Sequence, residues 1–143
     1  GMVGGQMIDI AAEGQALSIP EITRLQHMKT GALIACACES GAILGRAPVR
    51  QRAALHAFAH DLGLVFQITD DLLDAEGDES AAGKAVRKDS KAGKATFVTL
   101  LGEERARQQA QMLSDQSIAH LDCFDSEADL LRAAAKFVIN RDA

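Results

Sequence analysis

The apolar segment 62–74 carries acidic side chains at helical spacing, which requires a fold in which one helix presents an anionic face. Asp70 and Asp74 stand four residues apart, so on a helix they lie on the same face, one turn from each other. Gln67 lies one turn before Asp70 on this face, and Gly63 lies one turn before Gln67. The leucines and valine of the segment remain for packing elsewhere. The pattern therefore predicts a helix with one polar, functional face.

The three carboxylates of this segment need a positive partner if they line a pocket. Asp71 is rotated from Asp70 by about 100° around the helix. Two carboxylates about 6 Å apart repel by roughly 0.7 kcal/mol in water and by about 3 kcal/mol at an effective dielectric near 20. Oxygen ligands without His or Cys favour Mg²⁺ or Ca²⁺ over zinc. The alternative is a solvated acidic helix face, because most charged side chains are exposed.

Charge is segregated along the middle of the chain. From Asp61 to Glu79 there are seven acidic residues and no Lys or Arg, and from Lys84 to Lys94 there are five basic residues and one acid. Because residues 76–93 contain several glycines, we expect a loop that is mobile without ligand and ordered when its ligand binds. Carboxylates followed by a basic loop suit a metal-bridged polyphosphate. A surface salt-bridge network is the alternative, although each exposed pair contributes only about 0–1 kcal/mol.

The remainder of the sequence predicts an all-α fold. Only five of the 143 residues are aromatic, all of them Phe, and Ala and Leu are abundant. This composition favours helix over sheet. Ser18 and Glu21 form a capping-box pattern, and Ser126 with Asp129 is expected to cap the last helix. Helices are predicted over residues 2–12, 19–45, 48–75, 94–113, 117–123 and from 126 onward.

Composition excludes several classes of protein. The net charge of −5 argues against a nucleic-acid-binding surface. The three cysteines have no metal-type spacing, so we expect a reduced, cytoplasmic protein. No run of 18 apolar residues occurs, so no membrane span is expected.

The aspartate-rich segment and the basic segment resemble the second aspartate-rich region of the trans-isoprenyl diphosphate synthases, and more narrowly that of bacterial farnesyl or geranylgeranyl diphosphate synthases. Four motifs agree with this family in order and spacing. They are Gly4-Gly5-Gln6 with Asp9; Lys29-Thr30-Gly31; Phe66-Gln67 with Asp70-Asp71-Leu72-Leu73-Asp74, followed by Gly83-Lys84, Asp89 and Gly93-Lys94; and Thr96 through Glu103. The resemblance extends from Met2 to about Arg141, where the family often ends in basic residues.

The resemblance implies that residues 1–143 are the C-terminal portion of a single polyprenyl synthetase domain. The family domain is an all-α isoprenoid synthase bundle of roughly twice this length, and its first aspartate-rich motif lies upstream of these residues. No second Asp-Asp-x-x-Asp occurs in this chain. Gly1 is either the remainder of a cleaved tag or part of a native Gly-Met-x-Gly-Gly-Gln run from which an upstream portion was lost.

The resemblance also implies an activity, a cofactor and a set of site residues. The family condenses an allylic diphosphate, such as dimethylallyl or geranyl diphosphate, with isopentenyl diphosphate, using Mg²⁺, and we expect a homodimer. The implied metal ligands are Asp70, Asp71 and Asp74. The implied diphosphate ligands are Lys29, Lys84 and Lys94. Lys29, Thr30 and Gln67 are implied to be catalytic, and Gln6, Asp9, Phe66 and Asp89 to support the site.

Simpler interpretations of these residues stay open on the sequence alone. Lys29 lies where a polar helix half meets an apolar half, which also suits a lysine that extends along the edge of the core. Gln6 and Asp9 also suit an exposed polar stripe. His56 and His60 have the i, i+4 spacing of metal ligands, but no third ligand is evident, so we expect both on the surface.

Two other functions compete with the catalytic one. The first is a catalytically inactive truncated or regulatory helical subunit that binds a synthase partner through apolar surface. A magnesium- and phosphate-binding helical bundle ranks last, because no general base stands apart from the aspartates. On the catalytic interpretation, the chain alone is expected to be inactive, because the first aspartate-rich motif is missing.

Overall fold

The computed structural model of the chain describes residues 1–82 and 96–141, and for residues 76–82 it describes the helical backbone alone. The elements are α1 (Met2–Ala11), α2 (Ile19–Gln26), a π-helical turn η1 (His27–Gly31), α3 (Ala32–Leu44), α4 (Val49–Ala82), α5 (Phe97–Leu101), α6 (Glu103–Ala119), the 3₁₀ turns η2 (His120–Cys123) and η3 (Ser126–Ala128), and α7 (Asp129–Asn140). No strand occurs in the described ranges, and the predicted all-α fold is confirmed.

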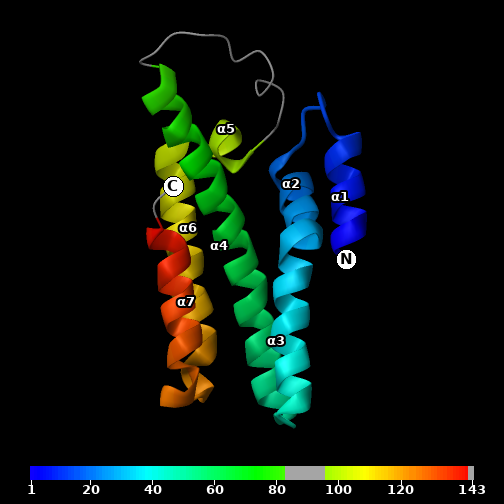
Figure 1. Cartoon of the computed structure of the whole chain (residues 1–143), viewed down its shortest axis with the longest axis vertical. Coiled ribbons are helices and arrows are strands. Elements are labelled where there is room, and N and C mark those ends of the chain that lie inside the picture. Colours follow the sequence, from blue (N-terminus) through cyan, green and yellow to red (C-terminus); the bar gives the residue numbers. More distant parts are fainter. Residues whose placement is uncertain (83–95, 142–143) are drawn as a thin grey trace.

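The long helix α4 is the centre of the bundle (Figure 1). Helices α6 and α7 pack along one side of it, and the continuous α2–η1–α3 helix packs along the other. Helix α1 lies outside this second group, against η1 and α2. The short helix α5 contacts α4 and α6 near the end of the bundle from which α4 leads into the undescribed residues.

Two groups of buried side chains follow one another along α4. The first joins α2, α4, α5 and α6 through Ile22, Val65, Ile68, Leu72, Phe97, Ala106, Ala110 and Leu113. The second joins α4 to η2, η3 and α7 through Phe58, Leu62, Leu121, Ala128 and Ala135. The first group includes Ile68 and Leu72, which lie in the acidic segment of α4, so the part of α4 that carries the aspartates is packed against α2, α5 and α6.

Two glycine contacts bring the backbones of three elements together around η1. A Cβ atom on Gly63 of α4 would lie 2.8 Å from the Cα atom of Gly31. A Cβ atom on Gly5 of α1 would overlap the backbone of Lys29. Because real Cβ atoms do not approach backbone so closely, only glycine allows α1 and α4 to meet η1 at these distances. The turn that carries Lys29 is thereby held between α1 and α4.

Several predicted boundaries change in the structure. The capping box is confirmed, because the Ser18 backbone N–H donates to Glu21 Oε2 at 2.8 Å. The sequence predicts that α4 ends near residue 75, but the helix continues to Ala82, since one interior glycine costs a helix only about 1 kcal/mol. The helix predicted over 94–113 is divided at Gly102, whose φ of 80° interrupts the helical backbone. Ser126 lies in η3 instead of capping α7, which begins after Ala128.

None of the helices in the described part of the chain combines the length and apolar character needed to cross a bilayer.

Candidate functional site

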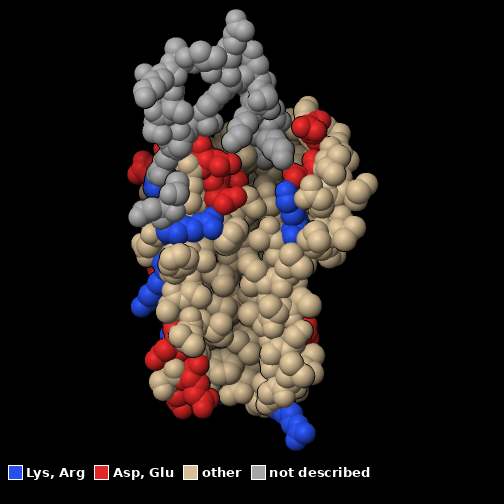
Figure 2. Space-filling view, in the orientation of Figure 1, with Lys and Arg blue, Asp and Glu red and all other residues tan. Residues whose placement is uncertain are grey.

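A pocket of about 210 Å³ opens where α1, α2, η1, α4 and the start of α5 meet. It is lined by Asp9, Ala12, Glu13, Leu17, Ile22, Leu25, Gln26, Lys29, Gln67, Asp70, Asp71, Asp74 and Thr96. Six of the residues singled out from the sequence are therefore brought together: Asp9, Lys29, Gln67, Asp70, Asp71 and Asp74. Figure 2 shows acidic side chains gathered on this upper part of the molecule, with basic side chains on either side of them.

Asp70 and Asp74 present the accessible acidic edge of the pocket. Both residues are exposed, and the Asp70 side chain is 53% accessible. They lie one turn apart on α4, as the i, i+4 spacing predicts. Two accessible carboxylates beside a lysine can bind a cation and an anion side by side.

Asp71 has a different environment from its two neighbours. Its Oδ1 atom accepts a hydrogen bond from Gln67 Nε2 at 3.1 Å, and its Oδ2 atom accepts one from the backbone N–H of Phe97 at 3.1 Å. The second bond ties the first residue of α5 to α4 across 26 positions of sequence. Burial raises the pKa of Asp71, and the nearby carboxylates of Asp70 and Asp74 add to this rise, while the two hydrogen bonds oppose it.

The raised pKa of Asp71 predicts a pH-dependent effect of Asp71→Asn. A carboxyl whose folded-state pKa lies above its unfolded value favours folding at low pH and loses this contribution as the pH rises through the folded value. The stability of Asp71→Asn relative to wild type should therefore increase between pH 4 and pH 7. Urea unfolding followed by circular dichroism at both pH values measures this difference. A difference that is constant or decreases with pH would contradict the prediction.

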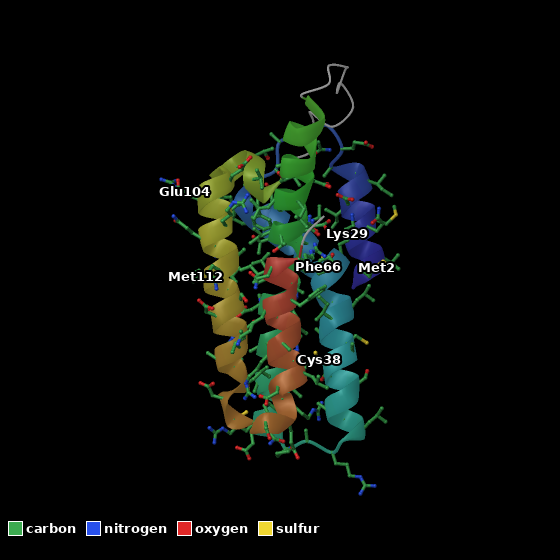
Figure 3. The ribbon with its side chains drawn as sticks, turned by 60° about the vertical axis from the view of Figure 1, so that its left-hand side comes forward. Met2, Lys29, Cys38, Phe66, Glu104 and Met112 are labelled. Carbon is green, nitrogen blue, oxygen red and sulfur yellow. The ribbon has the colours of Figure 1, made fainter. Side chains whose placement is uncertain are left out.

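Lys29 faces the pocket from η1 and is already paired. Its Nζ atom lies 2.6 Å from Asp9 Oδ2, so α1 and η1 are joined by a partly buried ion pair at the pocket wall. Figure 3 shows Lys29 on the side of the bundle nearest α1. The Lys29 side chain is 32% accessible, so its ammonium group is both paired with Asp9 and open to the pocket. An anion entering the pocket would meet Lys29 next to Asp9.

The remaining predicted residues divide into two groups. Thr30, Gln6 and Phe66 do not line the pocket, although Thr30 follows Lys29 within η1 and Phe66 precedes Gln67 on α4. Lys84, Asp89 and Lys94 lie outside the described residues, as do residues 83–93 of the predicted mobile loop. Their roles stay predictions.

Among the polar residues of the pocket lining, Glu13 and Gln26 were not singled out from the sequence, and Thr96 was named only as the start of the fourth motif. Gln26 lies one turn before Lys29, a spacing that could have indicated it. Its Oε1 atom is buried and has no hydrogen-bond partner among the described residues. Thr96 caps α5 by accepting a hydrogen bond from the backbone N–H of Thr99 at 3.1 Å.

Arg141 is joined to the acidic segment from the far end of the chain. Its Nη2 atom donates to Asp70 Oδ1 at 2.8 Å and to the carbonyl oxygen of Phe66 at 3.4 Å. Its guanidinium carbon lies 4.1 Å from the centre of the Phe66 ring, which is a cation–π contact. Figure 3 shows Phe66 near the end of α7. These contacts span 71 and 75 positions of sequence, so local patterns could not predict them.

The donor set fits Mg²⁺, provided that the ion takes only part of its shell from this chain. No group of three or more His, Cys, Asp or Glu side chains within the described ranges is arranged to hold a metal ion. Magnesium usually takes one or two carboxylates and completes its shell with water and phosphate oxygens. Asp70 and Asp74 provide two such carboxylates at the pocket edge. Asp71 fits less well, because both of its oxygens already accept hydrogen bonds.

Two of the four histidines contact a different carboxylate, Asp61, which is not part of the pocket lining. Asp61 is buried, with His120 Nε2 at 3.0 Å and His60 Nδ1 at 3.2 Å. The rings of His60 and His27 lie 4.6 Å apart. Burial lowers the pKa of His27, and His60 and His56 lower it further. His56 and His60 are exposed, as predicted, whereas His27 is half-buried.

The helix arrangement and the acidic pocket define a protein of the isoprenoid synthase fold. An FPP/GFPP synthase from Zymomonas mobilis superposes with a TM-score of 0.84 at 53% identity, covering 96% of this chain and 45% of that structure. Residues 1–134 match the model of the polyprenyl synthetase family. The chain belongs to the polyprenyl synthetase family, as the four motifs indicated.

Curated relatives agree with this assignment. A geranylgeranyl diphosphate synthase of Cyanophora paradoxa is 38% identical over 143 residues, which are 99% of this chain and 48% of that protein. The farnesyl diphosphate synthase of Escherichia coli is 38% identical over 146 residues, covering 99% of this chain and 49% of that protein. The chain therefore spans about half the length of these relatives.

Proposed function

We propose that this chain is the C-terminal portion of a prenyltransferase that joins an allylic diphosphate, such as dimethylallyl or geranyl diphosphate, to isopentenyl diphosphate. The observation that carries the proposal is the pocket, in which the acidic face of α4 stands opposite Lys29. Membership of the polyprenyl synthetase family and likeness to proteins named farnesyl and geranylgeranyl diphosphate synthase support it.

The chemistry requires charge stabilisation at the leaving group. The C–O bond of the allylic diphosphate breaks, and the diphosphate leaves with the electron pair. The double bond of isopentenyl diphosphate then forms the new C–C bond, and a proton is lost to the diphosphate. Bound Mg²⁺ would neutralise the charge that grows on the departing diphosphate. Fixed cations placed where this charge develops lower the barrier in the same way.

The residues of this chain would have distinct roles in binding the metal, binding the diphosphate and lining the site. Asp70 and Asp74 would bind the metal. Asp71 would bind it directly or through a water molecule, or would hold the start of α5 in place. Lys29 would bind diphosphate in place of its ion pair with Asp9, together with Lys84 and Lys94. Asp89 would support Lys84 or a metal-bound water. Gln67 and Thr30 would line the cation site, and Gln6 and Phe66 would support the walls.

The proposal concerns the complete protein, which we expect to be a cytoplasmic homodimer. A first aspartate-rich motif and the groups that bind isopentenyl diphosphate would come from the rest of its domain. The experiment is to isolate the protein that contains this sequence from its source cells, measure its intact mass, and assay it with both diphosphates and Mg²⁺. A mass near twice 15.1 kDa with prenyl transfer supports the proposal.

The same assay on the 143-residue chain alone should show no prenyl transfer, because the pocket has only one of the two acidic walls. Turnover comparable to that of an intact synthase would contradict the proposal that the second acidic wall comes from the rest of the domain. A full-length protein without activity would overturn the proposed function itself.

A second function is favoured by the apolar surface of the chain. Several large apolar side chains of α1 and α3 are exposed, among them Val3 at 70% and Leu44 at 84%. Such surface favours association with another helical element. A source protein near 15.1 kDa without activity would favour an inactive regulatory subunit that binds a synthase partner.

A further inference from the structure

The ion pair between Arg141 and Asp70 links the C-terminal end of the described chain to the pocket. Arg141 follows α7, and its side chain is only 18% accessible. It is held by three contacts: the 2.8 Å bond to Asp70 Oδ1, the bond to the Phe66 carbonyl oxygen, and the stack on the Phe66 ring. A side chain fixed at three points does not exchange freely with solvent, so its charge stays beside Asp70.

The positive charge of Arg141 acts on Asp70, one of the carboxylates that line the pocket. Within the described residues, Lys29 is the one lysine or arginine at the pocket lining, and that side chain is paired with Asp9. The guanidinium of Arg141 therefore neutralises the acidic edge of the pocket from outside its lining. A cation that binds Asp70 must share this carboxylate with the guanidinium group.

We propose that Arg141 is a positioning residue of the acidic site, which holds Asp70 through its Oδ1 atom and lowers the affinity of that carboxylate for a divalent cation. The proposal rests on the proposed function, because it takes Asp70 as a metal ligand. Its physical basis is simple electrostatics. A fixed positive charge 2.8 Å from one carboxylate oxygen repels a second cation at the same group.

The effect should be moderate, because Asp70 is half exposed and salt screens the interaction. Removing one positive charge at this position is expected to raise Mg²⁺ affinity by about 3- to 10-fold at 0.1 M salt. The consequence for function is a site that binds its metal weakly until diphosphate arrives to share the ion. Weak binding by the protein alone suits Mg²⁺, which is normally held with substrate phosphates.

The test is a titration of the chain with Mg²⁺ alone, followed through the backbone amide signals of residues 66–75 in ¹H–¹⁵N NMR spectra. Arg141→Gln and Arg141→Met remove the charge, and Met also retains apolar contact with the Phe66 ring. Arg141→Lys retains the charge. Arg52→Gln is the matched control, because it removes an arginine from an exposed pair with Glu39 that lies 3.2 Å apart and away from the pocket lining.

We expect both neutral variants to bind Mg²⁺ about 3- to 10-fold more tightly, and Arg141→Lys and Arg52→Gln to stay within about twofold of wild type. Unchanged or weaker binding in both neutral variants would overturn the proposal and leave the proposed function standing. Equal gains in Arg141→Lys or Arg52→Gln would also overturn it, because the local charge would not be the cause. If residues 66–75 did not respond to Mg²⁺ in any variant, the metal assignment of Asp70 would fall together with the proposal. Retained dispersion of the amide signals confirms that each variant is folded.

Discussion

Replacing Asp70 with asparagine in the complete protein should lower kcat/KM for prenyl transfer by about 10²–10³-fold, the range found when one electrostatic contact to a developing charge is removed. The substitution keeps the size of the side chain but removes the charge that Mg²⁺ requires. It also leaves Arg141 without its anionic partner. Steady-state assays with labelled isopentenyl diphosphate measure the loss, and raising the Mg²⁺ concentration should recover part of it.

The matched control is Asp115→Asn. Asp115 is exposed on α6 and accepts a hydrogen bond from Gln111 at 3.0 Å, so this variant loses the same charge away from the pocket. Its kcat/KM should stay within about twofold of wild type, since surface substitutions usually have small effects. An Asp70→Asn enzyme within threefold of wild type, on the same scale of surface effects, would remove Asp70 from the metal site.

Gly63→Ala should destabilise the chain by about 1–3 kcal/mol, the cost of forcing extra volume into a packed contact. The new methyl group would lie 2.8 Å from the Cα atom of Gly31, so α4 and η1 must separate. Because backbone faces backbone here, no flexible side chain can move aside to relieve the contact. Urea unfolding followed by circular dichroism at 222 nm measures the change; the chain has no Trp or Tyr for fluorescence.

Gly41→Ala is a control with the opposite sign. Gly41 lies inside α3, and a Cβ atom there would meet no other atom within 4 Å. Alanine should therefore stabilise the helix by up to about 1 kcal/mol through its higher propensity. If both Gly63→Ala and Gly41→Ala were more stable than wild type, the close approach of Gly63 to Gly31 would not exclude a side chain at position 63.

The parts of this molecule that depend on local chemistry were predictable from the sequence. The helix starting at Ile19 follows from the Ser18–Glu21 capping box. The shared face of Asp70 and Asp74 follows from helical spacing. The position of Gln67 on the same face was also predictable, because Gln67 lies one helical turn before Asp70.

Long-range pairs were not predictable in the same way. The contacts of Asp70 with Arg141 and of Asp61 with His120 join residues 71 and 59 positions apart. Helical periodicity says which face a side chain occupies, but it does not say which distant side chain meets it. Asp71 illustrates this limit: its sequence neighbours suggest a metal ligand, whereas its distant contact with the Phe97 amide adds a structural role.

The π turn at His27–Gly31 has a consequence for how this segment tolerates change in length. A π turn holds one residue more than an α-helical turn, so η1 accommodates one extra residue while α2 and α3 keep a common helical face. Deleting a single residue there would convert the π turn into an α-helical turn and leave Ile22 and Leu25, both buried, facing their present neighbours. The continuous α2–η1–α3 helix should therefore tolerate loss of one residue within η1 better than loss of one residue inside α2 or α3, where a deletion rotates the rest of the helix by about 100°.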